Sequence, residues 1–269
     1  MKAKNVIFTV LLILITCSSF YSCRRSEAGE FTIQRGVLTV GVEIAYPPME
    51  YYAEDGVTPM GFDVELAKAL AHTLNLSVNF VDTPWDLIFT RLNGNQYDCI
   101  ISSVSITQAR QASYNFSKPY ISNSLAIIVP KNSRLSITSP WQLAERTVGF
   151  QAGTTADEFM QELGRGGLRF VPRMYNTFFQ SINDLQSGRI DAVVTDLLVA
   201  YEIVASPDSP YEIVWINPED EKFGICIRRG NDLLTTVISE ALDSLWEDGT
   251  ILRISYDTFG MDLVSSARN

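Results

Sequence analysis

Apolar and polar positions along the chain follow two periods in turn, one typical of strands and one typical of helices. Residues 36–43 (GVLTVGVE) predict a strand, and residues 61–74 (GFDVELAKALAHTL) repeat apolar side chains at helical spacing. A second strand is predicted at 76–81 (LSVNFV), a second helix at 82–94 (DTPWDLIFTRLNG) and a third strand at 97–102 (YDCIIS). This β-α-β-α-β order predicts a parallel sheet with helices on both faces.

The second predicted helix carries signals at both ends. Thr83 is placed to be its N-cap, and Pro84 is placed at the first helical position, where a missing N–H costs nothing. Gly94 stands just past the expected end, as is common after helices.

The whole pattern then occurs a second time. Residues 146–151 (RTVGFQ) resemble 38–43 (LTVGVE), and residues 187–196 (SGRIDAVVTD) resemble 94–102 (GNQYDCIIS). In the second pair a glycine, a short polar spacer and an aspartate precede an apolar strand that ends on polar side chains. The repeat predicts two similar α/β lobes.

Two extended stretches connect these lobes, at 124–133 and 219–230, and a further predicted helix follows the second. The simplest arrangement returns the C-terminus to the first lobe. We therefore expect lobe 1 to comprise residues 37–127 and 222–269, and lobe 2 residues 128–221. Two strands would cross between the lobes and form a hinge, which gives an α/β clamshell in which each lobe is a mostly parallel sheet flanked by helices.

Polar side chains follow the predicted strands where each one ends. In open parallel sheets, ligands bind at the carboxyl ends of the strands. These ends carry Glu43, Gln151, Asp196 and a group of hydroxyls within IISSVSITQAR (100–110), namely Ser102, Ser103, Ser105 and Thr107. We expect them to line a cleft between the lobes.

The charges at these strand ends are suited to a zwitterion. The planar fork of Arg110 matches a carboxylate, and the N-terminus of the helix predicted near Thr155 also favours an anion. Asp196 supplies the opposite charge for an ammonium group, and α-amino acids carry both groups. The alternatives are a solvated Arg110 at a helix start and an Asp196 that only caps the following helix.

Two aromatic side chains, Tyr46 and Trp85, follow other strands of the first lobe. They could flank a ligand side chain, including a cationic one through cation–π attraction. The alternative for both residues is core packing.

The N-terminal residues differ from the rest of the chain. Lys2 and Lys4 precede an apolar run that is too short to span a bilayer comfortably, so residues 1–22 are predicted to be a signal peptide. Ser19-Phe20-Tyr21-Ser22-Cys23 resembles a bacterial lipoprotein cleavage site, which predicts lipidation of Cys23 and a membrane anchor, with an ordinary signal as the alternative. Residues 23–36 would then be a tether before the folded lobes. The protein is expected to be exported to the periplasm or the cell surface.

The charge and the cysteines of the chain indicate which partners and which covalent links to expect. Without residues 1–22 the chain has 19 basic and 31 acidic residues, a formal net charge of −12. Such a surface repels nucleic acid, so no nucleic-acid partner is expected. Cys99 and Cys226 lie in apolar runs and are expected to be buried thiols, with a disulfide between them as the alternative.

The chain after the signal peptide resembles the extracytoplasmic solute-binding proteins of polar amino-acid ABC transporters. The resemblance rests on GFDVELAKAL, YDCIISSVSITQAR, VGFQAGTT, GRIDAVVTD and DGTILRISYDTFG, which occur in the order typical of that family. It implies a monomeric clamshell that passes a free amino acid to an ABC permease, without a cofactor or a metal. It also implies that Arg110 binds the α-carboxylate, assisted by the backbone near Ser105 and Thr155, while Asp196 binds the α-ammonium. Tyr46 and Trp85 would then flank the ligand side chain, with Ser102 and Ser103 beneath it.

The resemblance leaves the ligand open. Glu43 corresponds to a position that is often Asp in the family and that can meet the end of the side chain, which favours arginine, lysine, ornithine or histidine. Glutamine remains an alternative because Gln151 and Ala156 occupy positions that read the side chain in other members. A ligand with an acidic side chain fits less well, since Glu43 would repel it.

Two functions of other classes stay open, because both occur on this fold. One is a dehydratase acting on small carboxylates, against which the only histidine, His72, lies in a surface-type helix. The other is a sensory module that works with a separate receptor. Neither a metal-ligand cluster nor a nucleophile–base pair is visible in the sequence, so the chain is not expected to be an enzyme.

Overall fold

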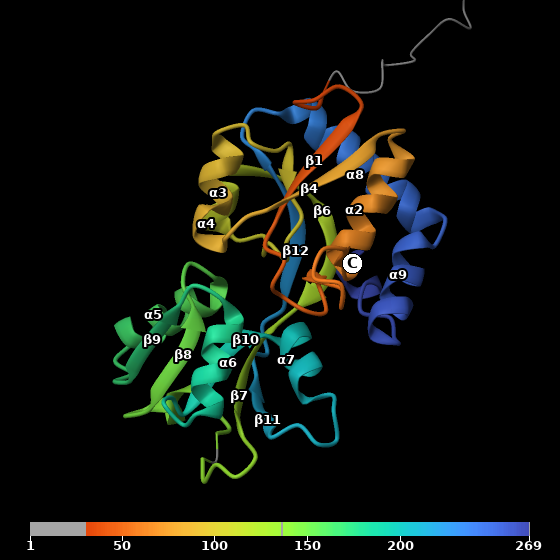
Figure 1. Ribbon diagram of the computed structural model, residues 1–269. Helices are drawn as coiled ribbons and strands as arrows, with labels where there is room; N and C mark the ends of the chain where they lie inside the picture. Colours follow the sequence, from red (N-terminus) through yellow and green to blue (C-terminus); the bar gives the residue numbers. More distant parts are fainter. Residues whose placement is uncertain (1–30, 136, 269) are drawn as a thin grey trace, which may run out of the picture.

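The computed structural model describes residues 31–135 and 137–268, which form two lobes side by side (Figure 1). Each lobe is built on a five-stranded sheet. The strands of the first sheet, in spatial order, are β4 (Ser77–Asp82), β1 (Val37–Val42), β5 (Cys99–Ile100), β12 (Glu221–Arg228) and β6 (Tyr114–Asn123). Those of the second sheet are β11 (Tyr211–Ile216), β7 (Leu125–Pro130), β10 (Ala192–Asp196), β8 (Thr147–Gln151) and β9 (Val171–Tyr175).

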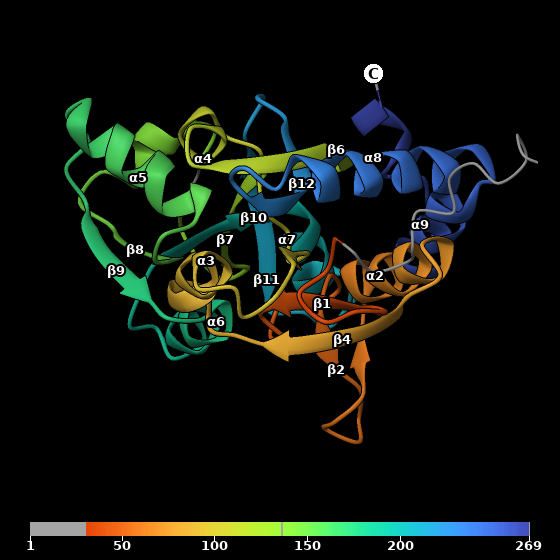
Figure 2. The same cartoon turned by 90° about the horizontal axis from the view of Figure 1, so that it is seen from above.

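Helices cover both faces of each sheet, as Figures 1 and 2 show from two directions. In the first lobe α3 lies on one side, and α2, α8 and α9 pack together on the other. The helices and the short hairpin of this lobe are α2 (Phe62–Thr73), α3 (Trp85–Asn93), α4 (Gln108–Gln111), α8 (Asp232–Glu247), α9 (Thr250–Phe259), the 3₁₀ turn η2 (Ser265–Arg268), β2 (Tyr51–Tyr52) and β3 (Pro59–Met60). The second lobe contains α5 (Thr155–Arg165), α6 (Phe178–Gln186), α7 (Leu197–Val204) and the 3₁₀ turn η1 (Pro140–Leu143).

The two-lobed α/β architecture predicted from the alternating periods is confirmed. The pairings β1–β4, β1–β5, β8–β9 and β8–β10 are parallel. The strands that enter and leave the hinge add antiparallel pairings, so each sheet is mixed, with two parallel and two antiparallel neighbours. The expected connector at 124–133 contains β7, so the second sheet begins at Leu125, three residues before the expected start of lobe 2.

The sequence of strand β7 is apolar at every position because both faces of the strand are buried. Leu125, Ile127 and Val129 pack into the core on the α5 face of the second sheet, whereas Ala126 and Ile128 belong to the core on the other face. Side chains of a strand alternate between faces, so a strand buried on both sides needs a continuous apolar run.

The helix ends predicted for residues 82–94 need one correction. Pro84, not Thr83, is the N-cap of α3, and it makes no side-chain cap bond. The Thr83 hydroxyl instead donates to the carbonyl oxygen of Val81 at 3.0 Å. Gly94 is the C-cap, as predicted.

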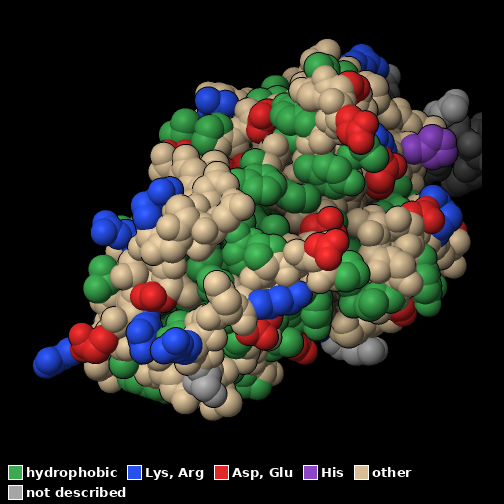
Figure 3. All heavy atoms as spheres, turned by 60° about the horizontal axis from the view of Figure 1, so that its bottom comes forward, with side chains coloured by type: hydrophobic (Ala, Val, Ile, Leu, Met, Phe, Trp, Pro, Cys, Tyr) green, Lys and Arg blue, Asp and Glu red, His purple; other side chains and the backbone are tan. Residues whose placement is uncertain are grey.

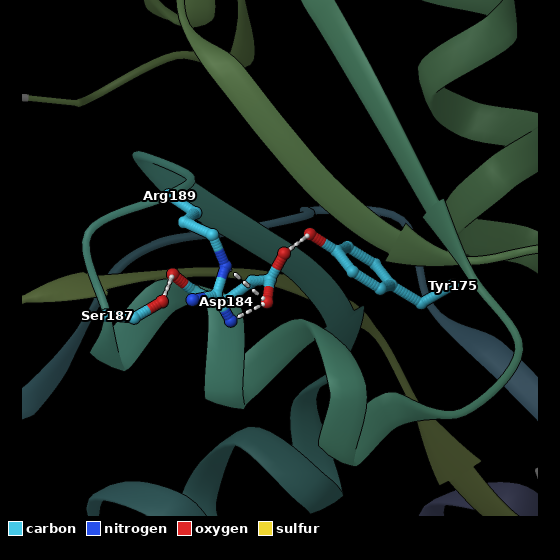
Figure 4. Close-up of polar contacts among 4 residues, drawn as sticks. All are labelled: Tyr175, Asp184, Ser187 and Arg189. Atoms are coloured by element: carbon cyan, nitrogen blue, oxygen red, sulfur yellow. Dashed lines mark hydrogen bonds and ion pairs between the residues drawn. The ribbon is translucent and has the colours of Figure 1, made fainter.

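A polar cluster braces β9 against α6 in the second lobe (Figure 4). The Tyr175 hydroxyl donates to Oδ2 of Asp184 at 2.7 Å, and Nε of Arg189 donates to Oδ1 of the same carboxylate at 2.9 Å. The cluster lies at the end of β9, next to Asn176, whose carbonyl oxygen accepts from Nε2 of Gln151 at 2.9 Å.

Candidate functional site

Ten of the side chains predicted to form the site surround one small cavity between the lobes. Thr107, which was also predicted to line the cleft, is not among them; it is the N-cap of α4, where its hydroxyl oxygen accepts from the backbone N–H of Arg110. Lobe 1 supplies the turn after β1, the start of α3 and the loop from β5 to α4, whereas lobe 2 supplies the end of β8, the start of α5 and the end of β10. The lining residues are Glu43, Tyr46, Trp85, Ser102, Ser103, Ser105, Arg110, Gln151, Thr154, Thr155 and Asp196, of which Thr154 alone lay outside the prediction.

Arg110 is buried in the cavity wall and is not a surface cation, since only 8% of it is exposed. Its guanidinium carbon lies 5.5 Å from the ring centre of Trp85 and 5.4 Å from that of Phe89. Nη1 donates to the carbonyl oxygen of Ser105 at 3.1 Å, and Nη2 donates to that of Gly153 at 3.4 Å. A guanidinium has five N–H donors, so the fork is fixed in direction and keeps donors for a carboxylate.

Asp196 ends β10 at the N-cap position of α7, yet its side chain makes no cap bond. It points toward lobe 1 instead, where the Tyr46 hydroxyl donates to Oδ2 at 2.6 Å and Nδ2 of Asn123 donates to Oδ1 at 2.6 Å. Burial raises the pKa of Asp196 to about 7, and the nearby negative charge of Glu221 adds to the rise. A cationic group bound here would favour the ionised form.

Glu43 joins the two lobes at another wall of the cavity. Its Oε2 accepts from Nε2 of Gln151 at 2.8 Å, and its Oε1 accepts from the backbone N–H of Trp85 at 3.2 Å. Gln151 also donates to the carbonyl oxygen of Asn176 at 2.9 Å, so its amide is oriented by lobe 2. Burial raises the pKa of Glu43 above its usual value.

The two aromatic residues both pack in the core and line the cavity. Trp85 donates from Nε1 to the carbonyl oxygen of Gly153 at 3.1 Å, while its ring belongs to an apolar cluster of lobe 1. Tyr46 contacts the ring of Phe178 edge to face, with centroids 5.7 Å apart. Core packing and a place beside the ligand, the two interpretations of Tyr46 and Trp85 from the sequence, are therefore compatible.

Beneath the cavity, two buried carboxyl groups anchor the serines of its floor, and the sequence did not point to either of them. Ser102 donates to Oε1 of Glu50 at 2.7 Å, and the backbone N–H of Ser103 donates to Oδ2 of Asp63 at 2.6 Å. Burial raises the pKa of Glu50 well above its usual value and that of Asp63 to about 7. The two acids keep Ser102 and Ser103 in place, with Ser103 at a positive φ of 50°.

Sequence reasoning also missed Glu221 and Asn123, which contact the site from the hinge strands β12 and β6. Glu221 accepts from the hydroxyls of Ser105 and Thr155 at 2.7 and 3.0 Å. Neither residue follows a parallel strand, so the rule that located the other residues does not apply to them.

The lobes are closed on one another at the cavity. About 20 Å³ of it is open to the centres of water molecules, and one buried water needs roughly 10–15 Å³ of such space. A molecule the size of an amino acid therefore enters only when the contacts between the lobes open.

Three other sequence expectations concern parts of the chain away from the cavity. The signal peptide at 1–22 and Cys23 lie outside the described residues, as does most of the tether. Its end packs on lobe 1, where the backbone N–H of Ile33 donates to Asp98 at 2.6 Å. Cys99 and Cys226 are both buried, free thiols, and none of the helices in the described part of the chain has the length and apolar character needed to cross a membrane.

Charged and apolar side chains are interspersed on the face shown in Figure 3, where neither sign of charge forms a continuous surface.

In the parts of the chain that the structure describes, no three His, Cys, Asp or Glu side chains are grouped as metal ligands would be.

Comparison with known proteins defines the class. The model for bacterial extracellular solute-binding proteins, family 3, matches residues 38–261. The L-cystine-binding protein TcyJ of Escherichia coli is 30% identical over 230 residues, which cover 86% of this chain and 85% of that protein. An ancestral arginine-binding protein bound to arginine is 34% identical, with a TM-score of 0.79 over 84% of this chain and 99% of that one. An ancestral arginine-binding protein bound to glutamine, also 34% identical, has a TM-score of 0.78 over 84% of this chain and 99% of that one.

This chain belongs to the bacterial extracellular solute-binding proteins of family 3, which confirms the resemblance seen in the sequence. Its relatives are named as binding proteins for cystine, arginine or histidine, and two are named as ABC transporter binding proteins.

Proposed function

We propose that this protein captures a free amino acid with a cationic side chain, such as arginine, lysine, ornithine or histidine, outside the cytoplasmic membrane and delivers it to an ABC permease. In this proposal Arg110 binds the α-carboxylate and Asp196 the α-ammonium. Glu43 receives the cation of the side chain, with Trp85 and Tyr46 on either side of it.

The observation that carries the proposal is the charge of the cavity wall. Two acids, Glu43 and Asp196, stand against one cation, Arg110. A zwitterion pairs with Arg110 and one acid, which leaves the second acid for another positive group. Burying a charge is costly unless it is paired, so a ligand with two cationic groups and one anionic group suits this wall best.

Capture would proceed by hinge closure. The ligand first meets Arg110, Trp85 and the serine floor on lobe 1, and lobe 2 then adds Asp196, Thr155 and Gln151. The hinge strands allow this motion because, within the described part of the chain, the backbone passes between the two sheets at β6–β7 and β11–β12 and at no other strand connection. The closed monomer would present surfaces of both lobes to the permease, and a lipid on Cys23 would hold it at the membrane.

Cystine is a second candidate, supported by the 30% identity to TcyJ. Its second half carries one ammonium and one carboxylate, for which Glu43 and the amide of Gln151 are suitable partners. Glutamine is a third candidate, since its side-chain amide could donate to Glu43 and accept from Gln151.

A thermal-shift experiment on the purified protein, unfolded and refolded to remove ligand, tests these candidates. The panel is arginine, lysine, ornithine, histidine, glutamine, cystine and glutamate. A ligand at 100 times its dissociation constant should stabilise the fold by roughly 2.7 kcal/mol. A shift with the cationic ligands alone supports the proposal, whereas a shift with only cystine or glutamine assigns the site to that ligand.

Arg110→Ala serves as the control for the site. We expect it to weaken binding of any of these ligands by about 2–5 kcal/mol, because the ligand carboxylate would be buried without its partner. If no amino acid shifts the wild-type protein, a dehydratase or a sensor becomes the better explanation, and chemical turnover of a bound acid would identify the former.

A further inference from the structure

Glu221 lies where both lobes and the hinge meet. It is the first residue of β12, the strand that returns the chain from lobe 2 to lobe 1. One oxygen atom, Oε2, accepts two hydrogen bonds, from Oγ of Ser105 in lobe 1 at 2.7 Å and from Oγ1 of Thr155 in lobe 2 at 3.0 Å. A single carboxylate oxygen thus joins the hinge, the first lobe and the second lobe.

The carboxylate of Glu221 does not take the place of a bound ligand in front of Arg110. None of the ion pairs among the described residues joins Glu221 to Arg110. The Arg110 fork donates to the carbonyl oxygens of Ser105 and Gly153 instead. Glu221 therefore accepts its hydrogen bonds from the two hydroxyl groups, and its charge acts on Arg110 without forming an ion pair, so the guanidinium donors stay available to another anion.

Thr155 is the first residue of α5 and moves with lobe 2. Its bond to Glu221 can exist only while the lobes are closed, because Glu221 stays with the hinge and with Ser105. A hydrogen bond to an ionised acceptor is stronger than one between neutral groups. The contact therefore adds to the stability of the closed form and contributes nothing to the open form.

We propose that Glu221 is the latch of the cleft: a positioning residue that stabilises the closed form by accepting the Ser105 and Thr155 hydroxyls, without touching the ligand. The inference rests on the proposed capture by hinge closure, and it adds a residue that the ligand contacts do not include. It also gives the two hydroxyls a fixed direction. Their protons point to Glu221, so the backbone N–H groups and Arg110 remain for the ligand carboxylate.

The test compares Glu221→Ala with Glu221→Gln at about pH 8. Glu221→Ala removes the acceptor, whereas Glu221→Gln keeps one oxygen that can accept from both hydroxyls. Asp220→Ala is the matched control, because it removes the same charge from the exposed neighbouring residue. Affinity for the ligand found in the thermal-shift panel is measured by calorimetry, and its dissociation rate by stopped flow.

A second measurement needs no ligand. Spin labels on Thr90→Cys in α3 and Glu162→Cys in α5, both exposed, report the distance between the lobes by pulsed electron resonance. In the ligand-free protein we expect Glu221→Ala to move the distribution toward longer distances, with Asp220→Ala close to the wild type and Glu221→Gln between the two, because a neutral amide oxygen accepts more weakly than a carboxylate. With ligand, we expect Glu221→Ala to weaken affinity about tenfold or more, mainly through faster dissociation, since apparent affinity follows the closed fraction.

Unchanged distances and unchanged affinity in Glu221→Ala would overturn the latch, and so would tighter binding, which would make Glu221 a competitor of the ligand. Equal losses in Glu221→Gln and Glu221→Ala would also overturn it, because the acceptor bond would then not be the cause. If the wild type binds no amino acid, the proposed function fails, while the ligand-free distances still decide whether Glu221 closes the lobes.

Discussion

At the scale of single residues, burial decides how each acid of the cleft behaves. Glu43 is 6% exposed, and its negative charge is balanced by N–H donors of Gln151 and Trp85 rather than by a cation. A bound cation stabilises an acid most when only neutral donors surround that acid. The identity of the ligand side chain should therefore depend strongly on this residue.

We predict that Glu43→Gln weakens a cationic ligand by about 1.5–3 kcal/mol, the usual range for a hydrogen bond to a charged group. Glutamine should lose less than about threefold in affinity, since a neutral amide can still bond to it. Calorimetry with both ligands measures the difference. Asp86→Asn removes a charge near Glu43 but outside the cavity wall, and an equal effect of that variant would mean that only net charge matters.

The rule that placed the site residues works where a side chain follows a parallel strand. It located Arg110, Asp196 and Glu43 because the carboxyl ends of β5, β10 and β1 face the cleft. Glu50 and Asp63 could not be found in this way, because their contact with the serine floor depends on how the loop after β1 and the start of α2 pack. The roles of Arg110, Asp196 and Glu43 in ligand binding stay predictions.

At the scale of elements, the start of α2 depends on one glycine. Gly61 has a φ of +115°, and a Cβ atom on it would lie 2.3 Å from the carbonyl oxygen of Met49. Both the backbone conformation and the backbone contact exclude a side chain. The turn that carries Tyr46 and Glu50 is thereby held against the first turn of α2.

Gly61→Ala should destabilise the fold by about 2–4 kcal/mol, from backbone strain and a clash with a backbone atom. Gly56→Ala is the matched control, since Gly56 also has a positive φ, +68°, but nothing lies within 4 Å of the added Cβ. That variant should cost only about 1 kcal/mol. Urea denaturation gives both values, and equal losses would mean that strain alone, not the contact with Met49, limits this position.

Elements with a clear period were predictable, and those defined by long-range pairing were not. The strands β1, β8 and β10 and the helix α2 lie within a residue or two of their predicted ends. Strand β6 was not predicted, because YNFSKPYISN mixes polar residues and a proline with its apolar positions. It is a strand because it pairs with β12 at the edge of the first sheet. The two strands lie far apart in the sequence, so a local pattern of residues cannot predict this pairing.

At the scale of the whole molecule, the buried acids give fold stability and ligand affinity opposite dependences on pH. Asp196 and Asp63 have folded pKa values of about 7 against an ordinary 3.8. Between about pH 4 and 7 the folded protein binds more protons than the unfolded chain, so stability decreases as pH rises. Exposed acids with lowered pKa values, such as Asp55, act mainly below that window.

We therefore predict that the ligand-free protein is more stable at pH 5 than at pH 7, measured by urea denaturation. Affinity should rise over the same interval and level off above about pH 7, because the ligand ammonium requires ionised Asp196. Asp196→Asn should remove part of the fall in stability. Stability that increases from pH 5 to pH 7 would contradict the assigned pKa directions.

The arrangement of the hinge strands also sets the order in which the protein can be assembled during synthesis. Strand β12 lies between β5 and β6 in the first sheet, yet it leaves the ribosome after every strand of the second. Leu125 and Asn217, at the two ends of lobe 2, are bonded to each other, so that lobe can close on itself as an inserted unit. Lobe 1 must wait with a gap in its sheet until residue 228 has been made.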